Sequence, residues 1–519
     1  MAQAEQGSLA SQYSKMETDR EIYLNRARDC AKVTIPSLIP PSGASSSTVY
    51  PSPYQSMGAR GVNNLASKLL LALFPPNSPF FRLLIDEFTV AELAQNEDAL
   101  SKVEEALGKI ERSIQTEIEA SALRVPAFEA LKHLVVAGNI LAYLPPDKKG
   151  GLKLYRLDKY VIKRDPRGNV LKIITKEAVS PLTLPPEFTE SLDRTDAEKK
   201  EGKPIDIYTI VKRTKVNWET WQEVKGKVVP ETKATFPLDK TPWIPLRMIA
   251  VSGEDYGRSY VEEYLGDLIS LEGLTKAIVQ GSAAAAKVLF LINPNGTTRK
   301  KDLAETESGG FAVGSDADVS VLQLQKQADF QVAHQTIQDL KERLSYAFLL
   351  NTAIQRNAER VTAEEIRYMA NELEDALGGV YSVLSQEFQL PIVTRIMFQM
   401  ERAKKLPVLP TGTVKPTITT GLEALGRGHD LSKMNLFLQH LQPLGPEVLA
   451  QYLSVGDYIQ RVATALGIPS EGLVKSDDQI MAEQQQAQQQ QMMMQLASTG
   501  MATEATKQLG ERLNANAEE

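Results

Sequence analysis

Cysteine, histidine and long apolar runs are scarce in this chain, and each scarcity excludes a class of protein. Cys30 is the only cysteine, so no disulfide can form within the chain, as is usual in a reducing compartment. The four histidines show no HExxH spacing, and the GxxxxGK[ST] pattern of a phosphate-binding loop does not occur. The sequence therefore predicts no metal site, no cofactor and no catalytic centre, and His133, in an apolar segment, is expected in or beside the core.

The chain also lacks the marks of a membrane protein and of a tight DNA binder. Its most apolar run, Leu69 to Phe74, is far shorter than the roughly 20 residues that span a bilayer. The N-terminal sequence has no basic start followed by an apolar stretch, so we expect no signal peptide and no membrane insertion. The formal net charge is −7, whereas proteins that neutralise many DNA phosphates are usually basic. We therefore expect a soluble intracellular protein without a tight nucleic-acid site.

What is present is helical periodicity, followed by strand alternation. Apolar residues recur at three- and four-residue steps, which predicts helices over 8–33, 57–74, 99–122 and 128–144. Strands are predicted around a turn at 165–169, and a hairpin is predicted from 205–213 and 218–229 with Lys225-Gly226 at its tip. Helices followed by strands, rather than strict alternation of the two, indicate an α+β, mainly α fold of roughly two to four domains.

Two later segments carry a narrower apolar stripe with a strict three-four spacing. The stripes consist of Val261, Tyr264, Leu268, Leu271, Thr275 and Ile278, and of Phe330, Ala333, Ile337, Leu340, Leu344 and Ala347. Such a stripe is typical of a seam between two long helices, so we expect packing there by Leu268, Leu271, Ile337 and Leu340. Gly266 and Gly273, on another side of the first segment, would let a neighbouring backbone approach closely.

Between these segments the sequence is β-like and rich in turns. Val288 to Ile292 and Val319 to Leu324 have strand character, and Asn293 to Gly296 predicts a turn. Two long helices, out and back, with a small β tip between them therefore predict a stalk and a head. Asp316 and Asp318 favour a solvated turn, although paired carboxylates also hold divalent metal in nucleases.

A long helix is predicted from Arg360 to Lys405, with a capping box at its start formed by Thr362 and Glu365. Gly378-Gly379 costs about 1 kcal/mol per glycine relative to alanine, and Pro391 about 3 kcal/mol more. We therefore expect this helix to kink or break near Leu390, and to persist only where it is packed on both sides of its weak points.

The polar segment before this helix, 351–360, carries Arg356 and Arg360, and Arg367 follows in the helix itself. Two interpretations stay open. The segment is either an ordinary exposed loop, or a loop that projects into a channel and contacts phosphates transiently.

Five stretches of sequence match one known family in content and in order. They are GARGVNNLASKLLLALFP (58–75), FEALKHLVVAGNILAYLP (128–145), YGRSYVEEYLGDLISLE (256–272), ERVTAEEIRYMANELEDALGGVYSVLSQEFQLP (359–391) and TITTGLEALGRG (417–428). With these stretches the chain resembles the portal (head-to-tail connector) proteins of short-tailed double-stranded DNA bacteriophages. The resemblance covers most of the chain.

The resemblance implies a portal fold and a ring of twelve copies at one capsid vertex, through which double-stranded DNA is packaged and ejected. The implied parts are a wing (1–255 and a long helix, 362–410), stem helices (256–287 and 329–350), a small β-containing clip (288–328), a channel loop (351–361), a C-terminal helical crown (411–480) and a low-complexity tail (481–519). The implied DNA-channel residues are Asn351, Gln355, Arg356, Asn357, Arg360 and Arg367. The implied docking residues of the clip are Arg299, Lys300, Lys301 and Asp302.

The same resemblance implies partners and a location. The clip would dock the terminase large subunit and later the tail adaptor protein, and the ring would also meet the major capsid, scaffolding and internal core proteins. Assembly would take place in the host cytoplasm, and the protein would end in the virion. Two other classes stay open: a metal-dependent nuclease that uses Asp316 and Asp318, and an internal scaffold or adaptor protein that forms elongated dimers or trimers.

Overall fold

The computed structural model describes residues 8–45, 47–76, 80–85, 97–146, 151–190, 192, 203–285, 289–307, 310–322, 327–350, 377, 379–407 and 414–418, and the short pieces 436–441, 443, 458–459 and 462. The chain divides into two compact units, Met1–Ala424 and Leu425–Glu519. The second unit is described at one helical turn, 436–441, and a few isolated residues. The remainder of the C-terminal helices predicted from the sequence lies outside the described residues, so the fold below is that of the first unit.

Three predicted N-terminal helices are confirmed: α1 (Leu9–Lys32), α2 (Met57–Leu73) and α4 (Glu97–Ala120). α1 begins at Ser8, whose hydroxyl accepts a hydrogen bond from the Ser11 amide and so satisfies a free helix donor. α2 packs its apolar stripe against α5 (Arg124–Ala137), and it positions the helix pair described below.

The fourth predicted helix, 128–144, is correct only in its first part, because α5 ends at Ala137 and Asn139–Tyr143 is strand β2. Gly138 ends the helix with φ +71°, and a Cβ there would collide with the backbone of Arg258. Asn139 then exchanges two side-chain hydrogen bonds with the backbone of Gly257, at 2.7 Å each. A short apolar run cannot distinguish a buried strand from a buried helix, which is why the sequence misled here.

Within the described residues the strands form four antiparallel sheets. The largest has the order β4 (Tyr160–Arg164), β5 (Val170–Val179), β6 (Ile205–Arg213), β7 (Asn217–Val224) and β8 (Lys227–Val228), with β9 (Ala234–Pro237) also paired to β7. A second sheet has the order β10 (Trp243–Arg247), β2 and β3 (Lys153–Tyr155). Two pairs complete the set: β1 (Phe81–Ile85) with β13 (Val414–Ile418), and β11 (Leu289–Ile292) with β12 (Val319–Leu322).

The prediction of a single hairpin over 205–229 is wrong in one respect, because this segment contains two successive turns. β6 and β7 are joined through 214–216, where the Thr214 hydroxyl and the Asn217 side chain bond each other at 2.6 Å. Lys225 and Gly226 do form a tight turn, with φ of +46° and +81°, but it joins β7 to the short strand β8.

Strand β13 is not predicted from the sequence either. Its partner is β1, with Phe81 opposite Ile418 in the register, so the chain returns to the N-terminal body after the long helical region. Pairing between segments so distant in the chain leaves no local periodicity to detect.

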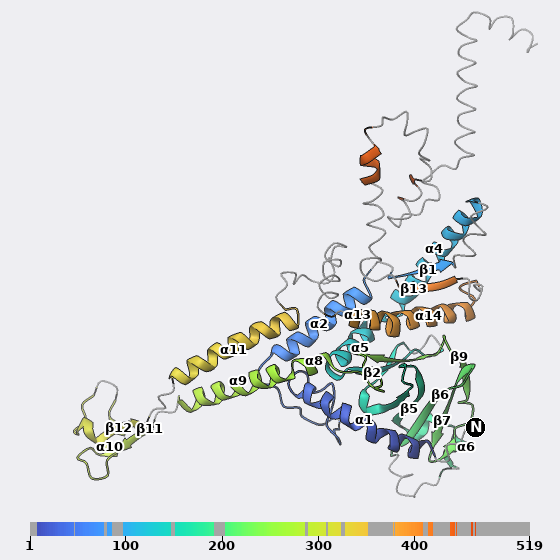
Figure 1. Cartoon of the computed structure of the whole chain (residues 1–519). Coiled ribbons are helices and arrows are strands. Elements are labelled where there is room, and N and C mark those ends of the chain that lie inside the picture. Colours follow the sequence, from blue (N-terminus) through green and yellow to red (C-terminus); the bar gives the residue numbers. More distant parts are fainter. Residues whose placement is uncertain are drawn as a thin grey trace, which may run out of the picture. The chain divides into compact units, whose positions relative to one another are not determined.

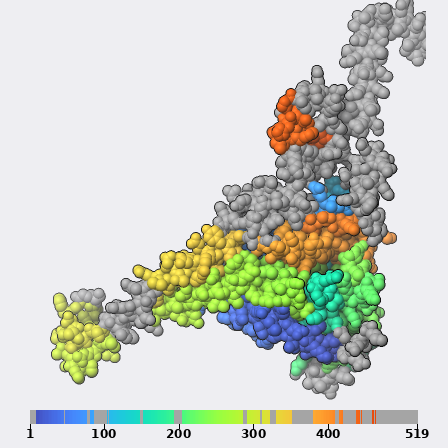
Figure 2. Space-filling view, viewed as in Figure 1, coloured from blue at the N-terminus to red at the C-terminus, as the bar shows by residue number. Residues whose placement is uncertain are grey.

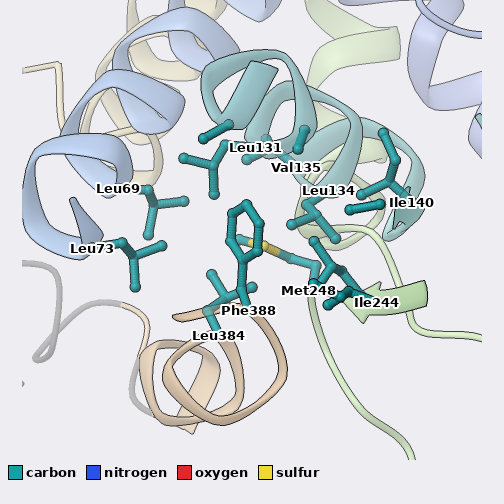
Figure 3. Packing of buried hydrophobic residues seen from close by; sticks show 14 of the residues in the cluster. Leu69, Leu73, Leu131, Leu134, Val135, Ile140, Ile244, Met248, Leu384 and Phe388 are labelled. Atoms are coloured by element: carbon teal, nitrogen blue, oxygen red, sulfur yellow. The ribbon is translucent and has the colours of Figure 1, made fainter. Parts of the chain in front are cut away.

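The main core forms where α2, α5, β2 and β10 meet the helical segment 379–402 (Figure 3). Figure 3 shows Phe388 in the centre, with Leu69 and Leu73 of α2 on one side and Met248 on the other. The ring of Phe388 also packs edge to face with that of Phe74, with centroids 5.2 Å apart.

The predicted irregularity near Leu390 is a π-helical segment, Ser385–Gln389, that joins α13 (Gly379–Leu384) to α14 (Leu390–Arg402). Pro391 lacks an amide hydrogen, and its ring would clash with the carbonyl one turn back in a regular helix. The Leu390 amide instead donates to the Ser385 carbonyl, five residues back, and the wider turn makes room. The predicted start of this helix, 360–376, lies outside the described residues.

His133 is a core residue of α5 and is 2% exposed, as predicted. Burial, more than the nearby Arg156 and Lys132, lowers the pKa of its imidazole to about 4. The imidazole titrates near pH 6.5 in an unfolded chain. Between pH 6.5 and 4 the unfolded state therefore binds more protons than the folded one, and stability falls as the pH falls.

We expect the free energy of unfolding to drop by about 2 kcal/mol through this group when the pH is lowered from 7 to 5. His133→Gln should remove that part of the pH dependence, whereas replacing the exposed His334 in the same way should preserve it. Urea unfolding followed by near-ultraviolet circular dichroism at several pH values measures both. A His133→Gln protein with the unchanged pH dependence would contradict the assignment.

Candidate assembly site: a helix pair and its tip

The two segments with narrow apolar stripes lie side by side as α9 (Leu265–Ala285) and α11 (Gln327–Ala347), and Figure 1 shows them running together from the body toward β11 and β12. We call them the helix pair. The stripe residues Leu268, Leu271, Ile337 and Leu340 are each at most 5% exposed within this single chain. Arg343 and Asp267 add an ion pair across the seam, at 3.1 Å.

The outer sides of the helix pair remain open to solvent in one chain. Ile269, Val279, Val332 and Tyr346 are each half exposed or more. At Gly266 and Gly273 a Cβ would meet nothing within 4 Å, so the close approach expected there does not come from the described part of this chain. Several exposed apolar side chains on one slender element mark a surface suited to a protein partner.

Phe348, directly after α11, anchors the helix pair to the body. Its side chain lies so close to Gly61 of α2 that a Cβ at that glycine would be 2.5 Å from the ring. The rings of Tyr260 and Tyr264 pack around it, and the Tyr260 hydroxyl donates to the Ala347 carbonyl at 2.8 Å. Tyr260 belongs to α8 (Tyr260–Glu263), the single turn that precedes α9.

Side chains of α2 also satisfy the carbonyls that α11 leaves free at its C-terminal end. The Asn64 amide donates to the carbonyls of Phe348 and Leu349 at 2.9 Å each, and Lys68 Nζ donates to Leu349 at 3.0 Å. A cation at this end also opposes the helix dipole. The position at which the chain leaves α11 is thus held by several contacts.

A second contact holds the segment between α1 and α2 against α9. The carboxylate of Glu272 accepts from the backbone amides of Tyr54 and Gln55, at 2.9 and 3.1 Å. Gln55 in turn accepts from the Gly58 amide at the start of α2 and donates to the Val33 carbonyl after α1. Glu272 and Gln55 together therefore link α9 to the end of α1 and the start of α2.

The far end of the helix pair is a small tip that includes β11, β12 and α10 (Lys300–Glu305). Thr298 is its buried polar centre, with its hydroxyl bonded to the Ser315 backbone and to the Asp318 carboxylate. Asp318 also accepts from the amides of Thr297 and Thr298, at 2.7 and 3.1 Å. Gly296 is required beside it, because a Cβ would collide with that carboxylate.

Asp318 lies in a turn, as the sequence favours, and its carboxylate is bonded within the tip. Desolvation would raise its pKa, but the hydrogen bonds from Thr298 and Thr297 outweigh it and lower the pKa overall. Asp316 and Asp318 lie in one short 3₁₀ turn. Among the residues described, no group of three or more His, Cys, Asp or Glu side chains is arranged to hold a metal ion.

The four residues implied in docking all lie exposed on the tip. Arg299 precedes α10, and Lys300, Lys301 and Asp302 form its first turn. Lys301 makes a long, exposed ion pair with Glu305, at 3.9 Å. Phe311 and Val313 follow and are almost fully exposed. The tip therefore presents basic and apolar side chains together.

The six residues implied in a DNA channel, Asn351, Gln355, Arg356, Asn357, Arg360 and Arg367, lie outside the described residues. Sequence patterns did not reveal the residues that hold the helix pair and the tip in place, among them Gly61, Asn64, Glu272 and Thr298. Gly61 and Asn64, in the motif GARGVNN, were a usable signal. A residue without a side chain and a residue that can cap another helix stand out inside an apolar helix, so their presence there suggests a structural role.

Gly61→Ala should destabilise the junction by about 1–3 kcal/mol, since the new methyl group overlaps the Phe348 ring. Gly108→Ala is the matched control: it also lies in a helix, but a Cβ there meets nothing, so a gain of up to about 1 kcal/mol is expected. Thermal unfolding and hydrogen exchange in α11 would measure the effect. The double variant Gly61→Ala, Phe348→Leu should recover part of the loss, and equal stability of the two single variants would disprove the contact.

In the described part of the chain, no helix combines the length and apolarity needed to cross a bilayer.

The model of the family "Bacteriophage head to tail connecting protein" matches residues 6–474. The chain is 45% identical to the portal protein of Escherichia phage T7 over 97% of this chain and 95% of that one. It is 46% identical to the portal protein of Enterobacteria phage T3 over 92% and 90%, and 30% identical to that of Enterobacteria phage SP6 over 91% and 90%.

Among solved structures, a chain from the neck of an empty gene transfer agent particle is 13% identical, with a TM-score of 0.36, over 80% of this chain and 90% of that one. The match to the family model and the identity to three portal proteins both extend along nearly the whole sequence. The chain therefore belongs to the family of bacteriophage head-to-tail connecting proteins.

Proposed function

We propose that the protein forms a closed ring of twelve copies at one vertex of a phage head, and that the ring is the conduit for double-stranded DNA during packaging and ejection. The portal proteins of T7 and T3, to which it is similar over nearly its full length, support this function. The observation that carries it is the helix pair, which buries one side within the chain and leaves apolar residues on its outer sides. Contacts from one subunit to the next around an axis would cover those residues and close a ring.

In this proposal the helix pair and α8 are the stem (256–287 and 329–350), and the tip is the clip (288–328). The body up to residue 255, with 362–410, is the wing. Residues 411–480 are the crown, although β13 lies in the body by its pairing with β1, and 481–519 are the tail. The division into a rigid rod and a separately stabilised tip supports this layout.

The channel loop, 351–361, would carry Asn351, Gln355, Arg356, Asn357 and Arg360, with Arg367 beyond it. Its first residue follows Leu350, whose amide donates to the Ser345 carbonyl at 2.8 Å, so the loop starts from a fixed point. A conduit should hold DNA weakly, because many neutralised phosphates per subunit would stall a moving duplex. The net charge of −7 with a few arginines in one segment suits such transient contact.

The tip would dock the terminase large subunit during packaging and the tail adaptor protein afterwards, through Arg299, Lys300, Lys301 and Asp302. The major capsid, scaffolding and internal core proteins would be further partners. The ring would assemble in the host cytoplasm and remain in the virion at the portal vertex. The exposure of the four charged residues and of Phe311 supports docking at the tip.

The protein acts in this proposal as a structural conduit and not as an enzyme. The competing nuclease interpretation needs a free carboxylate pair, whereas Asp318 Oδ2 already accepts from two amides and two hydroxyls. The scaffold interpretation predicts elongated dimers or trimers, which negative-stain microscopy distinguishes from rings.

We expect Ile269→Asp to reduce ring formation at least about tenfold while the chain still folds, because it places a charge on an exposed apolar face that a neighbour would cover. Ile269→Val, which preserves the apolar surface, is the matched control and should form rings. Leu268→Asp should block rings as well, but by disrupting the seam inside each chain, which circular dichroism would reveal. Native mass spectrometry of normal rings from Ile269→Asp would refute this interface.

Replacing Arg356 and Arg360 together by alanine should leave rings intact and change DNA packaging or retention, because the loop would lose its phosphate contacts. The length of packaged DNA and its loss from heads after heating are the measurements. Arg167→Ala, in an exposed turn of the body, is the control. Packaged length and retention equal to those of the unmodified protein would count against the channel-loop role.

A further inference from the structure

A cavity of about 760 Å³ lies in the body between the six-stranded sheet and α14. β5, β6 and β7 form one wall, α14 forms the opposite wall, and β10 and β13 contribute its remaining sides; Figure 1 shows where these elements lie in the chain. The space is partly open to solvent, so a ligand could enter it from the surface. Its volume is in the range of pockets that enclose a small ligand or a few peptide residues.

The walls of the cavity are mainly apolar and aromatic. They include Ile173, Val211, Trp218, Trp243 and Met397, all of them largely buried. The Trp218 ring is held in place because its Nε1 donates to the Leu238 carbonyl at 3.1 Å. A fixed apolar surface of this kind selects a large apolar group by shape.

One end of the cavity carries the guanidinium of Arg164, which is 8% exposed. Its Nε, Nη1 and Nη2 donate to the backbone carbonyls of Asp255, Gly168 and Pro245, at 3.2, 2.9 and 3.2 Å. Nη1 and Nη2 each carry a second hydrogen. Burial lowers the pKa of this guanidinium to about 10, so the charge is poorly solvated where it lies.

Two carboxylates, Glu387 and Asp255, lie close enough to act to raise the pKa of Arg164, but the hydrogen bonds that they accept come from groups other than its guanidinium. Glu387 also lines the cavity, but it binds the guanidinium of Arg247 through two of its nitrogens. Asp255 accepts from Lys163 Nζ at 2.8 Å and from the Arg164 backbone amide at 2.6 Å. A buried cation whose hydrogen bonds go to neutral carbonyls favours an added anion, because a charge-assisted bond is stronger than a neutral one.

The remaining charges of the cavity lie away from this end. Lys240 of the β9–β10 connection faces Glu401 of α14 at 3.9 Å, and Asp239 and Lys415 also contribute to the lining. Their signs balance, so the apolar walls and the Arg164 end determine what the cavity can select.

We propose that the cavity binds a peptide segment of another protein that carries a large apolar side chain next to a carboxylate. The apolar side chain would lie among Trp218, Trp243 and Met397, and the carboxylate would pair with Arg164. The binding site is formed by the body of one chain and needs no second copy, so its test is independent of ring formation.

Tryptophan fluorescence of the full-length protein gives the test, because two of its three tryptophans, Trp218 and Trp243, line the cavity. The probes are acetyl-Phe-Leu-Glu-amide, its Gln counterpart and 3-phenylpropionate. We expect saturable binding of the Glu peptide in the millimolar range, with a midpoint at least about tenfold lower than for the Gln peptide. Equal midpoints for the two peptides would overturn the proposal, and so would 3-phenylpropionate binding as tightly as the Glu peptide, since the site would then take a small free acid.

Three variants separate the two parts of the site. Thr394→Phe fills the cavity from α14 and should weaken both peptides at least about tenfold, whereas Arg164→Gln should abolish the preference for Glu over Gln. Arg167→Gln, exposed in the turn next to Arg164 and outside the cavity lining, is the matched control and should bind like the unmodified protein. Unchanged binding by Thr394→Phe would overturn the proposal, even if Arg164→Gln fails to fold.

Discussion

The contact between Phe348 and the bare backbone of Gly61 is the constraint on which the arrangement of the helix pair depends. Aromatic burial against α2 holds the end of α11, and the hydrogen bonds from Asn64, Lys68 and Tyr260 then fix its last carbonyls. Apolar burial supplies the attraction here, while the polar bonds supply direction. Without a glycine at position 61 the ring could not reach this depth, and the helices would leave the body at a different angle.

The two ends of the helix pair are stabilised by different physics. At the body, aromatic rings pack around one another. At the tip there is too little chain to bury a core, since β11 and β12 have four residues each and an isolated hairpin of that size is marginal. A polar centre takes over, in which Thr298 and Asp318 tie the loops together. The surface of the tip is therefore free to carry charged and apolar residues for a partner.

The helical segment 379–402 completes the body and also borders the cavity. Phe388 fills the centre of the main core from the π-helical segment, and the Arg247–Glu387 pair fastens that segment to β10. Beyond Pro391, α14 continues past the sheet without filling the gap between them. One irregular turn thus serves the core on one side and borders the cavity on the other.

The sequence alone was sufficient for the family, for the α+β, mainly α fold, for α1, α2 and α4, and for the helix pair. The family followed from the five matching stretches of sequence, and the helices followed from a stripe of apolar residues that repeats with the period of a helix, which is a local property. It also anticipated the irregularity near Leu390, because a proline inside a helix has a known cost. The exposed charge at Arg299 to Asp302 was also readable from composition, whereas the docking role of these residues stays a proposal.

Only the tertiary structure decided the rest. Gly138 ends α5 because the Arg258 backbone passes too close for a side chain, and β13 is a strand because β1 lies beside it. Asn64 and Lys68 cap α11, which lies much later in the chain. Glu272 of α9 holds the backbone of Tyr54, which lies much earlier. Each of these features is a contact between residues far apart in the chain, and local periodicity carries no record of which distant backbone will be the neighbour.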